Sequence, residues 1–135
     1  MTESDLIGIE RLLSDFGWYA DRADGDSLAQ LFLPEAVLIV SGLTLVGHKA
    51  IADDCRRRQA LDPQRKTRHL WSNLRVQSES DGAAEGVAIQ VTYEQSGDAT
   101  TKMRISDLID QYQRDATGVW RFRNRTIARQ MALEL

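Results

Sequence analysis

The sequence predicts an α+β domain in which three N-terminal helices cover a cone-shaped, curved antiparallel sheet and enclose a pocket. Two observations lead to this prediction. Apolar residues recur at helical spacing in the first 61 residues, and from Lys66 onward their period changes to two. The 135 residues fit one domain, residues 1–135, and 42% hydrophobic beside 27% charged residues is typical of a globular protein. Helices and strands are therefore expected to share a single core.

Three helices are expected before the long strands. The first spans residues 5–22 and carries an apolar face at helical spacing. That face consists of Leu6, Ile9, Leu12, Leu13, Phe16 and Ala20. Gly25 breaks the pattern, and Asp26 is a suitable N-cap for a short second helix that ends at Pro34. The third helix is expected over residues 49–59.

The strands follow from β-branched runs and from alternation. Ala36–Val40 reads as a short strand, and the glycines after it indicate a turn or a short hairpin. Four long strands are expected near residues 66–79, 84–95, 101–114 and 118–132. The segments between them contain Gly with Asp, residues that tolerate the left-handed backbone of hairpin turns. An antiparallel meander is therefore expected.

Several classes of protein do not fit the composition. No apolar run approaches the length of a membrane span, so no membrane partner is expected. The start Met-Thr-Glu-Ser-Asp lacks the features of a signal peptide, which favours a cytoplasmic location. The net charge of −3 provides no general attraction to nucleic acid.

Cys55 is the single cysteine, so it has no partner for an internal disulfide or a thiolate metal site. The three arginines that follow it, residues 56–58, would favour the thiolate if they lay close to the sulfur. The competing interpretation is a half-buried helix residue beside a solvated basic run.

Asp21 and His69 form the candidate catalytic pair. Asp21 falls at the C-terminal end of the first expected helix, and His69 falls early in the first long strand. A carboxylate that orients an imidazole makes it a stronger base that still works near neutral pH. The competing interpretations are a turn or capping role for Asp21 and a buried, hydrogen-bonded sheet position for His69.

The sequence gives no support for a metal or cofactor site. The only other histidine, His48, lies beside Gly47 at a helix start and is expected to be a cap or surface residue. Two histidines in different contexts, with no carboxylate at ligand spacing, do not make a metal site. Asp107 and Asp110 fall on opposite faces of their strand, and no glycine loop suited to a phosphate is present.

Four local motifs occur in an order that resembles a known family. They are the Asp-x-x-Asp-x-x-x-Leu-Ala-x-Leu-Phe run from Asp21 to Phe32, Gly47-x-x-x-Ile51, His69-x-x-x-Asn-Leu-Arg75 and Gly118-Val-Trp-Arg-Phe122. With helices first and a curved sheet after, nearly the whole chain is similar to the SnoaL-like members of the nuclear-transport-factor-2-like superfamily. Among these, the closest functional resemblance is to the dehydratases and dehydrochlorinases.

This resemblance implies roles for particular residues. His69 would be the general base, Asp21 its orienting partner, and Arg125, which follows Trp120-Arg-Phe122, an electrostatic helper. The residues expected to line the pocket beside His69 are Tyr19, Trp71 and Asn73. No cofactor is implied. The reaction would be an elimination, with isomerisation or cyclisation left open because both need the same base.

Arg125 poses a geometric difficulty for this role. In a regular strand it shares a face with Arg121 and Arg123, while Trp120 and Phe122 share the other face. An inward Arg125 therefore requires a bulge or a polar inner face. The competing interpretation is a solvated arginine face.

The substrate is expected to be a small apolar, polyketide-like, terpenoid or aromatic molecule, because Leu, Ile, Val, Trp and Tyr are expected to line most of the pocket. The second histidine of scytalone dehydratases has no counterpart here, since no histidine follows His69. A non-catalytic alternative is also open, namely a module like the β subunits of ring-hydroxylating dioxygenases or a ligand-binding or dimerisation domain. The enzyme hypothesis requires Asp21 within hydrogen-bond reach of His69 and both facing a cavity. A homodimer through the outer sheet face is expected.

Overall fold

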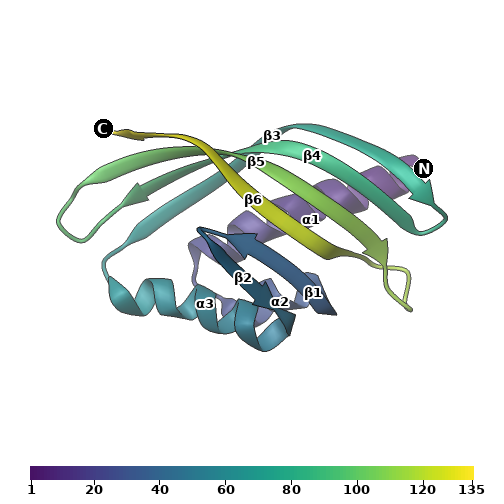
Figure 1. Cartoon of the computed structure of the whole chain (residues 1–135), viewed down its shortest axis with the longest axis horizontal. Helices are drawn as coiled ribbons and strands as arrows, with labels where there is room; N and C mark the ends of the chain where they lie inside the picture. Colours follow the sequence, from purple (N-terminus) through teal and green to yellow (C-terminus); the bar gives the residue numbers. More distant parts are fainter.

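The computed structural model describes all of residues 1–135 and has the predicted α+β architecture (Figure 1). The helices are α1 (Glu3–Asp21), α2 (Gly25–Gln30) and α3 (Gly47–Leu61). The strands are β1 (Phe32–Val40), β2 (Leu43–Val46), β3 (Lys66–Ser80), β4 (Ala83–Gln95), β5 (Thr101–Arg114) and β6 (Trp120–Glu134). The predicted bounds of the long strands are correct to within two residues. No helix combines the length and apolar character that crossing a membrane requires.

The six strands form one curved sheet in the order β2-β1-β6-β5-β4-β3. The predicted meander is present, because β3 to β6 pair consecutively and antiparallel. The pair β1 and β6 is parallel, with Leu38 opposite Arg125, so the sheet is mixed rather than antiparallel throughout. Because β1 reaches β6 through a helix and the whole meander, no hairpin forces the two strands to be antiparallel.

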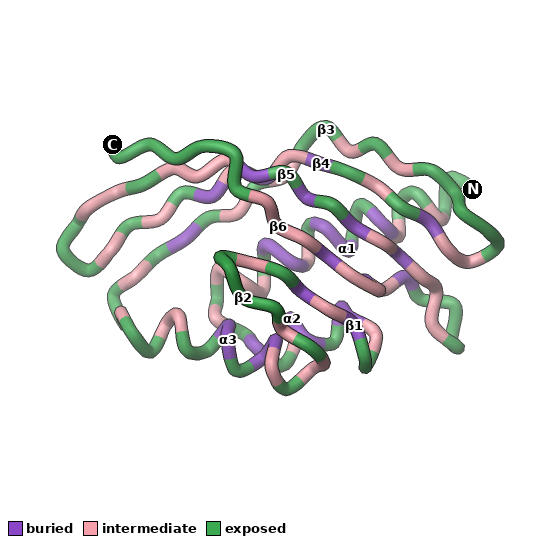
Figure 2. Tube along the Cα trace, in the orientation of Figure 1, coloured by how far each residue is buried: buried purple, intermediate pink, exposed green.

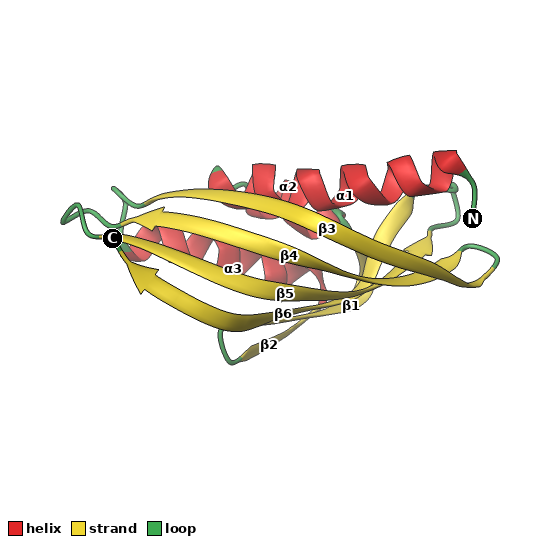
Figure 3. Ribbon diagram, turned by 90° about the horizontal axis from the view of Figure 1, so that it is seen from above, coloured by secondary structure: helices red, strands yellow, loops and turns green.

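Helix α1 packs its apolar stripe onto the sheet. Thr2 caps the helix by accepting from the Asp5 backbone N–H at 3.0 Å, and the Asp5 carboxylate accepts from the Thr2 backbone N–H in return. The buried face contains Ile9, Leu12 and Phe16 (Figure 2). Figure 3 shows α1 running along β3. This packing brings the end of α1 next to the start of the first long strand.

Aromatic rings form the centre of the core. Phe16 of α1 meets Phe32 and Phe122 edge-on, with ring centroids 6.3 and 6.0 Å apart. Phe122 also contacts Tyr112 at 5.8 Å. Such edge and tilted contacts add to the stabilisation from burying apolar area. The core lies toward one end of the sheet, under the first half of β6 and the second half of β5.

Two β-bulges decide which side chains face the helices. In β6, Phe122 pairs with Tyr112 and Asn124 pairs with Gln111, so Arg123 is the extra residue. In β3, the register shifts between Ser72 and Arg75, and Asn73 has a positive φ of 57°. Asparagine tolerates this left-handed conformation better than most residues. The bulges explain why strict alternation fails in both strands.

Helix α2 begins one residue earlier than its predicted cap. Asp24, and not Asp26, is the N-cap, because its carboxylate accepts from the Ser27 backbone N–H at 3.2 Å. Asp26 instead pairs with Arg56 of α3 at 2.8 Å. A Cβ at Gly25 would lie 2.5 Å from the Ala52 carbonyl oxygen, so the two helices pack at a distance that requires glycine.

The outer face of the sheet carries an apolar row across the meander. Leu70 pairs with Val91, Val91 with Ile105, and Ile105 with Met131. Leu70 and Met131 are 56% and 55% exposed. Because this apolar row carries no charge, it can pack against the same row of a second protomer around a two-fold axis without bringing like charges together. The expected homodimer through this face stays a prediction.

We expect sedimentation velocity to show a dimer at micromolar concentration, and Met131→Lys to shift it to monomer because two lysines would then face each other. Val119→Lys, which changes an exposed residue in the turn before β6, is the matched control and should leave the dimer intact. A monomeric parent chain, or a dimer unaffected by Met131→Lys, would contradict the prediction.

Candidate active site

The structure brings Asp21 and His69 into direct contact. Asp21 is the last residue of α1, and its Oδ1 lies 2.6 Å from His69 Nδ1. The His69 backbone N–H donates to the same carboxylate at 3.1 Å, and the Thr67 hydroxyl donates at 3.0 Å. Three donors therefore fix the carboxylate at the start of β3. His69 Nε2 has no protein partner and belongs to the ring that lines a cavity.

The pKa of Asp21 reflects two opposed effects. Burial alone would raise it, but the hydrogen bonds and charge of His69, with the Thr67 hydroxyl, bring it below its ordinary value of 3.8. Asp21 is therefore ionised at neutral pH. A carboxyl group with a lowered pKa stabilises the folded state at pH values above its ordinary pKa. This stabilisation is lost as the pH falls through the lowered pKa.

Gly17 sets how closely α1 approaches β3. It lies one turn before Asp21 on the same face of the helix. A Cβ at Gly17 would lie 3.1 Å from His69 Cβ and 3.1 Å from the His69 carbonyl oxygen. Any larger residue would therefore push the end of α1 away from His69. Gly17 positions the pair and does not itself reach a substrate.

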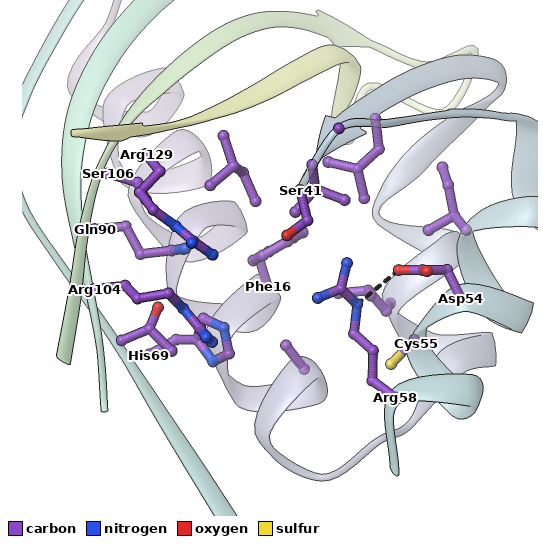
Figure 4. Close-up of a pocket in the computed structure, with 18 of the residues that line it drawn as sticks. Phe16, Ser41, Asp54, Cys55, Arg58, His69, Gln90, Arg104, Ser106 and Arg129 are labelled. Carbon is purple, nitrogen blue, oxygen red and sulfur yellow. Dashed lines mark hydrogen bonds and ion pairs between the residues drawn. The ribbon is translucent and has the colours of Figure 1, made fainter. Parts of the chain in front are cut away.

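The cavity beside His69 measures about 430 Å³, which suits a small organic molecule. It lies between α1, α3 and the inner face of the sheet (Figure 4). Eight of its 19 lining residues are hydrophobic, among them Phe16, Leu28, Leu38 and Ile51, and none is Trp or Tyr. The expectation of a mostly apolar, Trp- and Tyr-lined pocket is therefore wrong. Four arginines line the cavity, namely Arg58, Arg65, Arg104 and Arg129.

Three of these arginines have carboxylate partners. Arg65 and Arg104 both contact Glu94, at 2.7 and 3.1 Å. Burial would raise the pKa of Glu94, but the two arginines lower it to about 2, so it is ionised at neutral pH. Arg58 pairs with Asp54 at 2.9 Å. Sequence reasoning missed this cluster. Strand register could have located Arg104, because it pairs with Thr92, which pairs with His69.

Arg125 does not reach this cavity. The bulge at Arg123 turns it inward, as an inward Arg125 required, but its guanidinium is only 1% exposed and pairs with Asp110 at 2.8 Å. It also lies 4.4 Å from the ring centroids of Phe16 and Phe122. Arg125 is therefore neither an electrostatic helper at the cavity nor part of a solvated arginine face, and both predictions are wrong. Arg125 is a core ion pair.

The three residues expected to contact substrate do not line the cavity. Trp71 shares the inner face with His69, but its indole N–H donates to Ser14 of α1 at 2.9 Å. Asn73 is exposed, because the bulge ends the alternation that would have turned it inward. Tyr19 is half-buried and packs against the core cluster. The uncharged polar residues that line the cavity are instead Gln90, Thr92 and Ser106 on β4 and β5, with Ser41 after β1.

The remaining reactive residues have structural surroundings. Cys55 lines the cavity, and burial followed by the Asp54 charge raises the pKa of its thiol. Of the two interpretations of Cys55, the thiolate is therefore wrong, and the helix residue beside a basic run is the one that fits, with Cys55 buried and not half-buried. His48 Nε2 lies 2.7 Å from the Phe32 carbonyl oxygen and ties the start of α3 to β1. No group of three or more His, Cys, Asp or Glu residues is arranged to hold a metal ion.

The pattern of the SnoaL-like domain matches residues 4–126. The chain belongs to the SnoaL-like family. No curated protein matches the sequence. Family membership agrees with the resemblance drawn from the four motifs and with the helix-then-sheet order.

Solved structures share the fold at low sequence identity. A hexachlorocyclohexane dehydrochlorinase from Novosphingobium barchaimii LL02 is 20% identical, with 98% of this chain and 90% of that chain covered and a TM-score of 0.85. A scytalone dehydratase-like protein from Novosphingobium aromaticivorans is 18% identical over 100% and 92% of the two chains, with a TM-score of 0.86. An aromatic ring hydroxylase-like protein from the same genus is 19% identical over 100% and 96%, with a TM-score of 0.87. These similarities establish the fold and leave the activity open.

Substitution of Gly17 by Ala should displace His69 from Asp21, because the added methyl meets the His69 backbone. We expect the resonance of the His69 backbone amide proton to move upfield, because its hydrogen bond to Asp21 would weaken. The higher helix propensity of alanine would act on the stability of α1 and not on this contact. Gly8→Ala is the matched control, since its methyl would meet only the Trp120 side chain. An unchanged His69 amide in Gly17→Ala would show that glycine is not needed there.

Asp110→Asn should lower the free energy of unfolding by about 3–5 kcal/mol, because it leaves the buried Arg125 charge unpaired. Arg125→Met combined with Asp110→Asn should lose less than the two single changes together, as chemical denaturation can measure. Additive losses would mean that the ion pair makes no net contribution.

Proposed function

We propose that this protein is a cofactor-independent lyase of the dehydratase or dehydrochlorinase type. The observation that carries the proposal is the 2.6 Å contact between Asp21 and His69 Nδ1, with the other ring nitrogen unpartnered at a cavity of about 430 Å³. This is the arrangement that the enzyme hypothesis requires and that a filled or unpaired site would lack. The shared fold with a dehydrochlorinase structure is consistent with it.

The proposed reaction begins with proton removal. Asp21 accepts the Nδ1–H of neutral His69, which leaves the Nε2 lone pair directed at the cavity. Nε2 takes a proton from a substrate carbon, and the released electron pair forms a double bond to the adjacent carbon. The bond to the leaving group breaks with its electron pair, and hydroxide or halide departs. In a dehydration, the proton held on His69 passes to the departing oxygen to give water.

The proposed reaction develops positive charge on His69 and negative charge on the substrate, and residues of the site can stabilise both. The imidazolium formed on His69 is next to the ionised Asp21, which is buried and held by three donors. Negative charge develops at the leaving group or on an enolate oxygen. Arg65 and Arg104 line the same cavity and share only Glu94, so this pair leaves positive charge there without Arg125.

His69→Gln should lower turnover by at least about 100-fold, the usual contribution of a positioned base, and Asp21→Asn should do so by a similar factor. The measurement is loss of water or chloride followed by NMR, with cyclic β-hydroxy ketones, cyclic β-hydroxy acids and hexachlorocyclohexane as probes. His48→Gln is the matched control, because it changes the other histidine and keeps a donor for the Phe32 carbonyl. Turnover unaffected by His69→Gln would overturn the proposal and favour the binding-module alternative.

A further inference from the structure

The inner face of the sheet presents two adjacent polar rows to the cavity. In the first row His69 pairs with Thr92, and Thr92 with Arg104. In the second row Gln90 pairs with Ser106, and Ser106 with Arg129. Neighbouring strands lie about 4.8 Å apart, so each row is a compact line of side chains across three strands. Figure 4 shows Gln90, Ser106, Arg104 and Arg129 gathered on the same side of the cavity as His69.

The middle of both rows consists of polar side chains that open only toward the cavity. Gln90, Thr92 and Ser106 are only 5%, 4% and 6% exposed, and all three line the cavity. None of their polar side-chain atoms is a fully enclosed atom without a partner, so these atoms are open to the cavity and not sealed in the core. A polar group that faces a cavity can exchange water for a ligand at little cost. A molecule in the cavity can therefore form hydrogen bonds with these three side chains.

Arg129 is the only cavity arginine without a carboxylate. Glu94 holds Arg65 and Arg104, and Asp54 holds Arg58. Arg129 forms no ion pair, although it belongs to the cavity wall beside Ser106. Two carboxylates thus face four cavity arginines, and Arg129, the one with no carboxylate beside it, lies next to the amide of Gln90 and the hydroxyl of Ser106. A singly charged planar anion matches this set of donors.

We propose that the second row, Gln90, Ser106 and Arg129, binds a carboxylate group of the substrate. This assignment rests on the proposed function, because the carboxylate anchors the molecule while its reacting carbon faces His69 Nε2. Arg129 donates through its guanidinium, Ser106 through its hydroxyl and Gln90 through its side-chain N–H. The natural substrate is then an organic acid and not a purely apolar molecule. The carboxylate is a binding group and remains intact in the reaction.

The test uses the full chain and two probes of nearly equal shape, cyclohexanecarboxylate and the neutral cyclohexanecarboxamide. Binding is followed by NMR chemical shifts of the Gln90 side-chain amide and the Arg129 guanidinium. We expect the carboxylate to bind at least tenfold more tightly than the carboxamide at pH 7. Arg129→Gln should remove that preference. Arg129 is exposed and unpaired, so this change should not affect folding.

Arg123→Gln, on the same strand but outside the cavity, is the matched control and should retain the preference. Equal binding of the two probes, binding of neither, or a preference that survives Arg129→Gln would each overturn the carboxylate site. The outcome is separable from the proposed function, because His69→Gln should abolish turnover and keep carboxylate binding. A carboxylate preference in a protein without elimination activity would support this site and defeat the proposed lyase.

Discussion

The close approach of α1 to β3 is the constraint on which the candidate site depends. Gly17 lets the helix pack against the His69 backbone, and one turn later Asp21 meets the His69 ring and its backbone N–H. The C-terminal end of a helix is an unfavourable place for a carboxylate. Here three donors from β3 compensate for it. The same contact therefore ends the helix, fixes the first long strand and orients the imidazole.

Two bulges then distribute the remaining side chains between core and cavity. The bulge at Arg123 allows both Phe122 and Arg125 to point inward, one into the aromatic cluster and the other onto Asp110. Beyond Arg125, regular alternation turns Ile127 and Arg129 toward the cavity. The first part of β6 thus contributes to the apolar core, and the next part lines the polar cavity.

The sequence was sufficient to predict the long strands, the fold class and the contact between Asp21 and His69, but the second helix ends at Gln30 and not at Pro34, because β1 already begins at Phe32. Period-two alternation and hairpin turns placed the long strands, and family resemblance selected Asp21 and His69. It was not sufficient to predict the cavity wall. The bulge in β3 ends the alternation at Asn73, so Asn73 was assigned to the wrong face. Arg125 does point inward through the bulge in β6, but it pairs with Asp110 in the core and does not reach the cavity. The positions of Arg104 and Arg129 at the cavity follow from the strand register, which a single sequence does not specify. The parallel pairing of β1 with β6 likewise depends on the complete meander.

The most direct measurement is the tautomer of neutral His69, read from its two ring nitrogen shifts by long-range ¹H–¹⁵N NMR. The claim that Asp21 orients a base toward the cavity requires the proton on Nδ1 and a free Nε2. We therefore expect the Nδ1–H form in the parent chain and a mixture in Asp21→Asn. A predominant Nε2–H form in the parent chain, or the same tautomer in both proteins, would contradict the account.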